Sequence, residues 1–151
     1  MNNVERFLAH AITLEREAAR RYEELSAAMG TAGNPVVKEF FARMAYFSRK
    51  HLAEATARAG FRDVPQLGAD DYEWPDGVSP EVADWVGVDG FLDTPAALQL
   101  ALESERRGHA YYAAIATSTD DAELRALATE FAEEEAEHMA ELEKLIATCT
   151  A

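Results

Sequence analysis

The sequence contains an internal repeat, which limits the fold more than any other feature. In residues 11–22 and again in 101–112, an alanine is followed by a glutamate and then a tyrosine at the same spacings. In residues 45–51 and again in 132–138, an alanine precedes a histidine by the same interval. Apolar matches are common between amphipathic helices, but a glutamate, a tyrosine and a histidine that recur together are not. We therefore expect one half to be a structural copy of the other, related by an approximate two-fold axis.

Each repeated segment lies in a stretch with helical periodicity, where apolar residues recur every three or four positions. The chain has 151 residues, enough for one domain with a hydrophobic core. It is rich in Ala, Leu, Glu and Arg, which are strong helix formers, whereas β-branched residues and alternating runs are scarce. These features predict a single all-α domain over residues 1–151.

Local signals place the ends of four helices. They are Asn3 and Gly30 with Gly33 for the first helix, Asn34-Pro35 and Gly60 for the second, Thr94-Pro95 for the third, and a capping box of Asp120 with Glu123 for the fourth, which runs to about Ile146. The short links within each pair predict two antiparallel helical hairpins, over residues 3–60 and 94–148.

A long connection over residues 61–93 joins the two hairpins. Four of the five prolines and both tryptophans fall in this stretch or at its edge, and one short helix is predicted from Ser79 to Val86. The connection is long enough to cross the length of the bundle, so the second and third helices should be parallel. That is the connectivity of a ferritin-like four-helix bundle with one crossover.

The repeat places polar residues on the core faces of the helices. Glu15 and Glu105 belong to two helices, while His51 and His138 belong to the other two, and Glu135 precedes His138 in a Glu-x-x-His pattern. Such groups need partners in a core, and a metal ion satisfies carboxylates and imidazoles together. A glutamate from two helices and a Glu-x-x-His from the others is the ligand pattern of di-iron and di-manganese bundles.

This pattern resembles the rubrerythrin-like branch of the ferritin-like superfamily, over residues 1–60 and 94–148. The resemblance implies a di-iron site between the hairpins that reacts with peroxide or oxygen. The matched positions are Glu15 and Glu105 for terminal carboxylates, Glu135 for a bridging carboxylate, His51 and His138 for the histidines, and Tyr22 and Tyr112 for tyrosines next to the ligands. Rubrerythrins proper also carry a four-cysteine rubredoxin domain, which the single Cys149 cannot build, so we expect the bundle alone.

The first Glu-x-x-His pattern is broken, because Ser48 stands where the resemblance implies a bridging glutamate. Three carboxylates would then face two divalent ions and leave an excess positive charge, which a hydroxide, an exogenous anion or another side chain has to balance. We expect a tight metal at the complete half-site, where Glu105 lies with the second Glu-x-x-His, and a weak or absent metal at the half-site of Glu15 and His51.

Other polar residues lie near the expected ligands. His109 follows Glu105 by one helical turn, and it is either a replacement ligand, a hydrogen-bond partner of a ligand, or a partly exposed histidine. His10 lies well around the helix from Glu15, which predicts a surface or rim position. The remaining flanking acids are expected to be solvated; these are Glu17, Glu103, Glu133, Glu134 and Glu137.

The net charge of −14 disfavours nucleic acid and anionic membrane surfaces as partners. No apolar stretch is long enough to span a bilayer, and no signal peptide is visible, so we expect a cytoplasmic protein. Apolar crossover residues could cover the bundle or contact a second subunit, and we expect a homodimer; these residues are Trp74, Trp85, Phe91 and Leu92.

Three functions fit the sequence. The first is an oxidoreductase with two irons that reduces peroxide or oxidises Fe(II) and needs a separate electron donor. The second is a metal-binding or storage module with one site, for which iron, manganese or zinc would serve. The third is a bundle that has lost its metal and acts through protein contacts.

Overall fold

The computed structural model describes residues 3–31, 35–60, 62–75, 77, 79–80 and 94–150. Four α-helices make up most of them: α1 (Val4–Thr31), α2 (Pro35–Ala59), α3 (Thr94–Ser118) and α4 (Ala122–Thr150). A short 3-10 helix, η1 (Ala69–Asp71), lies in the crossover, and no strand occurs within the described ranges. The all-α prediction is therefore confirmed.

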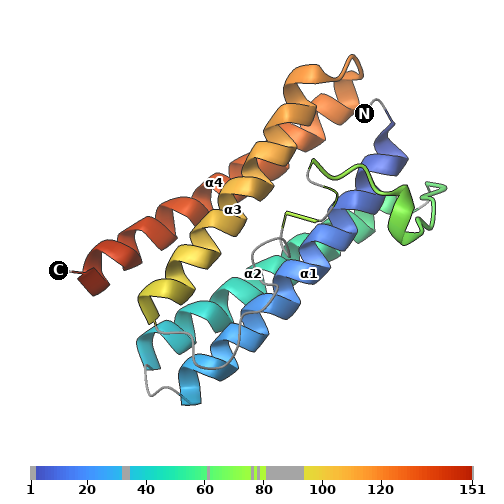
Figure 1. The fold of residues 1–151 in the computed structure, drawn as a ribbon. Helices are drawn as coiled ribbons and strands as arrows, with labels where there is room; N and C mark the ends of the chain where they lie inside the picture. The colour runs from blue at the N-terminus through green and yellow to red at the C-terminus, as the bar shows by residue number, and fades with distance from the viewer. Residues whose placement is uncertain are drawn as a thin grey trace.

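The helices form two antiparallel hairpins, α1 with α2 and α3 with α4 (Figure 1). α2 and α3 run in the same direction, as the long crossover predicts, and the N- and C-termini lie at opposite ends of the bundle (Figure 1). α1 also approaches both helices of the second hairpin. The arrangement is the ferritin-like four-helix bundle that the sequence predicts.

The sequence predicted the N-terminal capping residue of α1 correctly but not that of α4. The backbone N–H of Arg6 donates to Oδ1 of Asn3 at 2.9 Å, so Asn3 caps α1 as predicted. The cap of α4 is Asp121, whose Oδ1 accepts the backbone N–H of Leu124 at 2.9 Å. The prediction of Asp120 was wrong by one residue, because the spacing of Asp120 and Glu123 matched a capping box, whereas Asp121 has Leu124 at that spacing.

Some other boundaries also shift. α4 continues to Thr150 and does not end at Ile146, since residues 147–150 contain no proline or glycine. The predicted cap at Asn34 and the predicted short helix beyond Pro80 fall on positions outside the described residues, as do Trp85, Phe91 and Leu92.

The described part of the crossover packs on α1. The Tyr72 hydroxyl lies 2.8 Å from Oγ1 of Thr13, and Arg6 forms an ion pair with Glu73. The backbone N–H of Glu73 donates to Nε2 of His10 at 2.8 Å. These bonds join the crossover to the outer side of α1.

His10 is completely buried, so the prediction of a surface or rim position was wrong. Its Nδ1 lies 2.8 Å from the carbonyl oxygen of Arg6, and its ring packs against Tyr72 and Trp74. Helix periodicity correctly turns His10 away from Glu15, but the crossover covers the side of α1 to which it points.

The core consists of two apolar clusters, and all four helices contribute to each of them. One cluster includes Tyr22, Phe41 and Leu98, and the other includes Phe7 and Phe131. Along every helix, a buried polar residue lies between the parts that belong to the two clusters. The bundle therefore contains a polar layer between two apolar layers.

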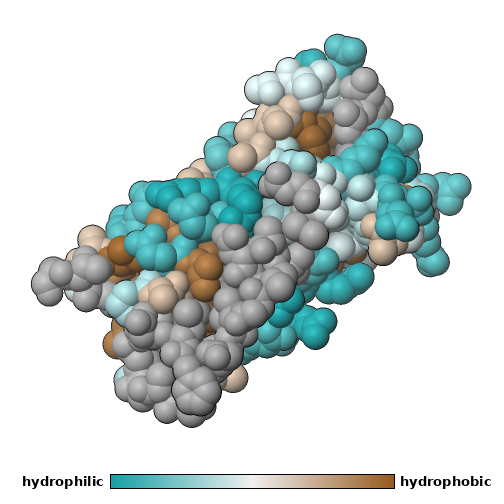
Figure 2. Space-filling model, viewed as in Figure 1, coloured by the Kyte–Doolittle hydropathy of each residue, from teal (hydrophilic) through white to brown (hydrophobic). Residues whose placement is uncertain are grey.

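The surface seen in Figure 2 is mostly hydrophilic, with small apolar patches between the charged groups. Val36 and Tyr46 of α2 are the large apolar side chains that remain exposed among the described residues. No helix in the described part of the chain is both long enough and apolar enough to cross a membrane.

Candidate metal centre

The polar layer brings together the ligands that the sequence predicts. It is formed by six buried side chains: Glu15 of α1, Ser48 and His51 of α2, Glu105 of α3, and Glu135 and His138 of α4. Ser48 and His51 are one helical turn apart, as are Glu135 and His138, so both residues of each pair lie on the same side of their helix. The four helices thus direct their polar core residues to one level of the bundle.

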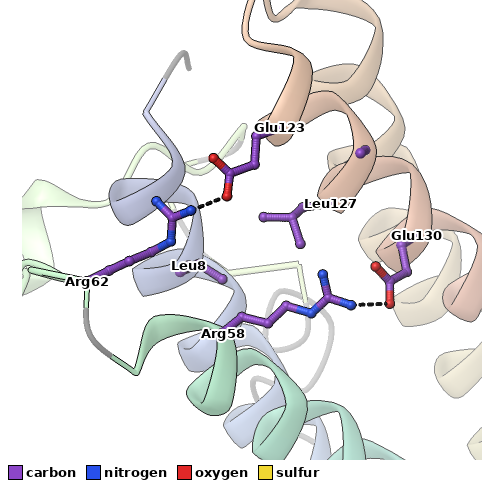
Figure 3. Close-up of a pocket in the computed structure, with 7 residues that line it drawn as sticks. Leu8, Arg58, Arg62, Glu123, Leu127 and Glu130 are labelled. Carbon is purple, nitrogen blue, oxygen red and sulfur yellow. Dashed lines mark hydrogen bonds and ion pairs between the residues drawn. The ribbon is translucent and has the colours of Figure 1, made fainter.

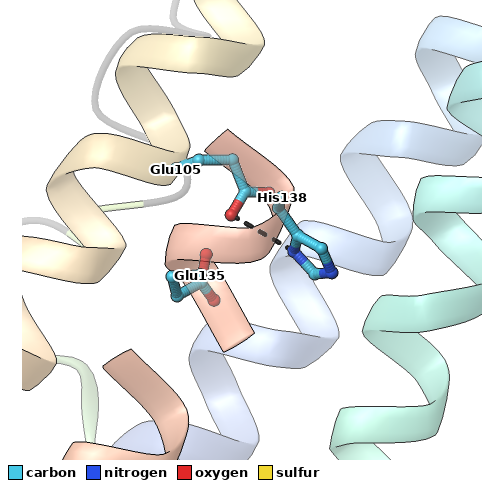
Figure 4. A group of neighbouring side chains, drawn as sticks. All are labelled: Glu105, Glu135 and His138. Carbon is cyan, nitrogen blue, oxygen red and sulfur yellow. Dashed lines mark ion pairs between the residues drawn. The ribbon is translucent and has the colours of Figure 1, made fainter. Parts of the chain in front are cut away.

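One half of the layer is a compact cluster of three side chains that could bind a metal. Single ligand atoms of Glu105, Glu135 and His138 all lie within 4.8 Å of one another (Figure 4). Nδ1 of His138 lies 3.4 Å from Oε2 of Glu105. Two carboxylates and an imidazole in this arrangement suit a divalent transition metal.

In the other half of the layer, the histidine and glutamate lie farther apart. Nδ1 of His51 lies 3.8 Å from Oε2 of Glu15. The rings of His51 and His138 stack with their centroids 5.2 Å apart, which places the two halves side by side. Ser48 is buried at this level but contributes a hydroxyl where the other half has a carboxylate.

Buried atoms of the layer that make no hydrogen bond to any described residue include Nδ1 of His51, Nδ1 of His138 and Oε2 of Glu105. Their closest approaches to opposite groups, 3.4 and 3.8 Å, exceed ordinary N–H···O distances. Buried polar atoms are normally satisfied, and these three belong to metal-ligand types. The layer therefore fits a metal ion, which would bond to atoms that the protein leaves without partners.

Two tyrosines connect the hairpins through the terminal glutamates. The hydroxyl of Tyr22 in α1 donates to Oε1 of Glu105 in α3, and the hydroxyl of Tyr112 in α3 lies 3.4 Å from Oε1 of Glu15 in α1. Each tyrosine thus reaches the glutamate of the opposite hairpin. This exchange is what an approximate two-fold relation between the hairpins predicts.

The surroundings hold these groups in different charge states. Burial opposes ionisation of Glu105, but hydrogen bonding to Glu135 and the charge of His138 lower its pKa to about 2. Burial also opposes protonation of His138, but Glu105 outweighs it and raises its pKa. Burial and the neighbouring His138 lower the pKa of His51 to about 4, so His51 is neutral at pH 7.

Glu134 was predicted to be solvated, and the structure shows otherwise. It is half-buried, and its Oε2 lies 3.4 Å from Nε2 of His51. Burial and repulsion from Glu54 and Glu130 raise the pKa of Glu134 to about 7. No sequence signal distinguished it from the exposed Glu133 beside it, because its environment is supplied by α2.

The repeat shows how the two halves of the layer differ. By the offset that relates His51 to His138, Phe47 corresponds to Glu134 and Ser48 to Glu135. Phe47 faces His138 with the ring centroids 6.1 Å apart, whereas Glu134 faces His51. Both acids at these positions come from α4, and neither has a counterpart on α2.

His109 does not join the cluster of Glu105, Glu135 and His138. Its Nδ1 lies 2.9 Å from the backbone carbonyl oxygen of Ala132, so it connects α3 to α4. This contact favours a structural role over that of a replacement ligand.

A surface groove of about 260 Å³ lies between α1, α2 and α4, near the start of α4 (Figure 3). Leu8 and Leu127 line it, and it is flanked by ion pairs of Arg58 with Glu130 and Arg62 with Glu123. None of its lining residues belongs to the polar layer. Its ion pairs connect the two hairpins at this end of the bundle.

Comparison with known proteins agrees with this geometry. The sequence model of the Rubrerythrin family matches residues 6–59. A crystal structure of an uncharacterized conserved protein from Magnetospirillum magnetotacticum MS-1 is 38% identical, with a TM-score of 0.81, and the match covers 97% of this chain and 95% of that one. Residues 6–59 therefore carry the sequence pattern of the rubrerythrin family, and nearly the whole chain is related to the Magnetospirillum protein. Comparison with curated proteins gave no match.

The match to the Rubrerythrin family model includes Glu15, Ser48 and His51 but not Glu105, Glu135 or His138. At the level of the polar layer, α2 offers one metal-ligand type where α4 offers two. The 151 residues contain one cysteine, so they cannot form the four-cysteine site of a rubredoxin domain.

Proposed function

We propose that this protein binds iron in the polar layer and uses it to reduce peroxide or oxygen. The observation that carries the proposal is the buried set of Glu105, Glu135 and His138, whose ligand atoms converge in a low-dielectric core. Two neighbouring irons would supply the two electrons that peroxide reduction consumes. The apolar layers on both sides keep bulk water away from this chemistry.

The side chains around the ligands fix their orientation. Tyr22 holds one oxygen of Glu105 and leaves Oε2 of the same carboxylate available to a metal. Glu134 is placed to accept the Nε2–H of His51, which leaves Nδ1 as the free ring nitrogen that faces Glu15. A carboxylate that fixes the tautomer of a ligating histidine is a general feature of metal sites.

Glu134 also provides a carboxylate that compensates for the one missing at position 48. Glu15, Glu105 and Glu135 supply three negative charges, and Glu134 adds a fourth beside His51. Four carboxylates balance two divalent ions in a core where uncompensated charge is costly. A bound cation favours the ionised form of Glu134, although burial raises its pKa in the metal-free protein.

A second candidate function is a metal-binding module with a single site. The buried Ser48 favours it, because the half-site of Glu15 and His51 lacks a carboxylate of its own on α2. The half-site of Glu105, Glu135 and His138 is complete and should bind metal more tightly.

The first test is the metal content of protein purified without added metal or chelator. About two irons per chain supports the di-iron site, and about one supports the single-site module. If reconstitution with iron, manganese and zinc gives no bound metal, the bundle acts through its surface and the proposal is overturned. Re-oxidation of the reduced protein by peroxide then separates an oxidoreductase from a storage module.

A matched pair of variants ties this test to the site. His138→Gln removes a ligand, so the metal content should fall, whereas His109→Gln changes a histidine that bonds to the Ala132 carbonyl and should retain the metal. Equal loss in both variants would contradict the assignment of His138 as a ligand.

The partners of the protein form part of this proposal. Reduction of peroxide needs a separate electron donor, since no donor other than the metal is built into these residues. We also propose a homodimer in the cytoplasm, and a monomeric mass at micromolar concentration in light scattering would contradict the dimer.

A further inference from the structure

A continuous row of aromatic rings leads from the polar layer to the surface of the crossover. The rings of Tyr112 and Tyr111 lie 5.5 Å apart, and those of Tyr111 and Trp74 lie 5.3 Å apart. Trp74 then stacks on Tyr72 at 5.3 Å with the ring planes almost parallel. All four residues are of types that can lose an electron and regain it.

The two ends of this row lie in different environments. Tyr112 is fully buried, and its hydroxyl lies 3.4 Å from Oε1 of Glu15 in the polar layer. Tyr111 is also buried, whereas Trp74 and Tyr72 are partly exposed. The row therefore spans from a predicted metal ligand to solvent.

The outer end of the row is held in place by bonds to α1. The His10 ring packs against both Trp74 and Tyr72, and it accepts the backbone N–H of Glu73 between them. The hydroxyl of Tyr72 lies 2.8 Å from Thr13. These contacts fix the stacking of the two outer rings on the side of α1 next to Tyr111.

We propose that Tyr112, Tyr111 and Trp74 carry electrons from a one-electron reductant in solvent to the polar layer, with Trp74 as the residue that the reductant meets. The proposal rests on the proposed function, because the electrons are those that peroxide reduction consumes at the ligand cluster. The separate electron donor acts at Trp74.

The electrons and protons of this transfer balance. Each peroxide takes two electrons and two protons and gives two waters. The reductant gives up one electron and one proton at a time, as ascorbate does, and two such steps supply one peroxide. Each electron passes from Trp74 through the rings of Tyr111 and Tyr112 to the layer, and each proton is released to solvent, from which peroxide takes up the protons that it needs.

Tyr111 acts as a bridge between the other two rings. Its hydroxyl is buried and has no hydrogen-bond partner in the described part of the chain, so oxidised Tyr111 would have no acceptor for its proton. Loss of an electron from Tyr111 would leave a charge in an apolar cluster, which is costly. The ring of Tyr111 is therefore needed, and its hydroxyl is not.

The test adds peroxide to iron-loaded protein without a reductant, so that the oxidising equivalents are left on the protein. The expected result is a radical detected by electron paramagnetic resonance and oxidation products of Trp74 detected by peptide mass spectrometry. Tyr111→Phe keeps the ring and should retain Trp74 oxidation. Tyr111→Leu removes the ring and should lower it several-fold, while ascorbate should suppress it in the unmodified protein.

Three controls keep the outcomes separate. Tyr46 is 64% exposed and lies outside the row, so its oxidation reports an oxidant that diffuses through solvent. Thermal melting of Tyr111→Leu checks that the variant is folded, and Trp74→Phe should slow ascorbate oxidation without loss of bound iron. Metal-free protein should show no Trp74 oxidation.

If the unmodified protein binds iron but does not consume peroxide, the proposed function fails and the electron path fails with it. If peroxide is consumed while Tyr46 is oxidised as strongly as Trp74, or while Trp74 oxidation is unchanged in Tyr111→Leu, the path alone is overturned. Selective oxidation of Trp74 that depends on the ring at position 111 supports it.

Discussion

Glu134 lies beside the histidine of the half-site in which Ser48 stands in place of a carboxylate. A carboxylate at position 48 would complete the symmetry of the polar layer, but α2 carries Phe47 and Ser48 where α4 carries Glu134 and Glu135. Glu134 reaches across from α4 to the histidine of the deficient half-site. In the proposed metal site, Glu134 would supply the charge that α2 lacks.

Replacing Ser48 with glutamate should raise the metal content towards two per chain, because it adds the carboxylate that the half-site of Glu15 and His51 lacks. Elemental analysis of both proteins after identical reconstitution measures this. Ser48→Ala serves as the control and should leave the metal content unchanged. An unchanged content in Ser48→Glu would contradict the assignment of position 48 to a bridging site.

Glu134→Gln should weaken metal binding at the half-site of His51 by about 10- to 100-fold, the range found when the outer partner of a ligating histidine is lost. The half-site of Glu105 and His138 should keep its affinity, since Glu134 lies beside His51. Competition with a chelator measures both constants. Glu133→Gln changes an exposed neighbour on the same helix, and an equal effect in that variant would attribute the loss to net charge alone.

The sequence predicted which polar residues face the core better than it predicted the surroundings of those residues. Glu15, Glu105 and His138 could be found because a residue's position on its own helix determines whether it faces the core. His10 and Glu134 could not, because each is buried by an element distant in the sequence: His10 by the crossover and Glu134 by α2. Periodicity describes one helix at a time and contains no information about what covers its flank.

His10 of α1 is one of the residues that join the crossover to this helix. His10 uses Nδ1 towards the Arg6 carbonyl and Nε2 as acceptor for the Glu73 N–H, so it serves in its neutral form. Burial lowers its pKa below the ordinary 6.5, and the nearby charges of Arg6 and Glu73 act in opposite directions.

The His10 contribution to stability should be present above pH 6.5 and should be lost as the pH falls below that value, because the unfolded chain then binds a proton that the folded chain refuses. His10→Gln keeps a donor and an acceptor but does not titrate. Chemical unfolding over this pH range should therefore show a steeper loss in the wild type than in the variant. Parallel curves would contradict the assignment, since all other titrating groups are common to both proteins.

Helix boundaries were predictable where a cap has one local candidate and less so where it has two. Asn3 is the single capping residue before α1, and the structure confirms it. Before α4, the capping-box spacing favoured Asp120 over its neighbour Asp121. Thr119, which accepts the backbone N–H of Asp121, is part of the context that places the cap. The course of the crossover over α1 depends on tertiary contacts that no local pattern specifies.

The whole molecule is two hairpins joined by two apolar layers and one polar layer. The apolar layers are complete without a ligand, whereas the polar layer holds Nδ1 of both histidines without a hydrogen bond to any described residue. Two metals that share Glu135 would join both hairpins, because the ligands of the two half-sites together come from all four helices. Metal binding should therefore stabilise the whole bundle as one unit.

Metal bound in the polar layer should raise the melting temperature of the protein. A ligand that binds only the folded state contributes about 4 kcal/mol at a thousandfold excess over its Kd. For a domain of this size each kcal/mol raises Tm by about 2–4 °C, so saturating metal should raise it by roughly 8–16 °C.

Differential scanning calorimetry of chelator-treated protein, with and without added Fe(II) under anaerobic conditions, measures this shift. His138→Gln should melt at one temperature whether or not metal is added, while His109→Gln should keep the wild-type shift. An equal shift in His138→Gln would mean that metal binds on the acidic surface. The increase in Tm would then reflect screening of the −14 net charge, and metal binding in the polar layer would not contribute to the stability of the bundle.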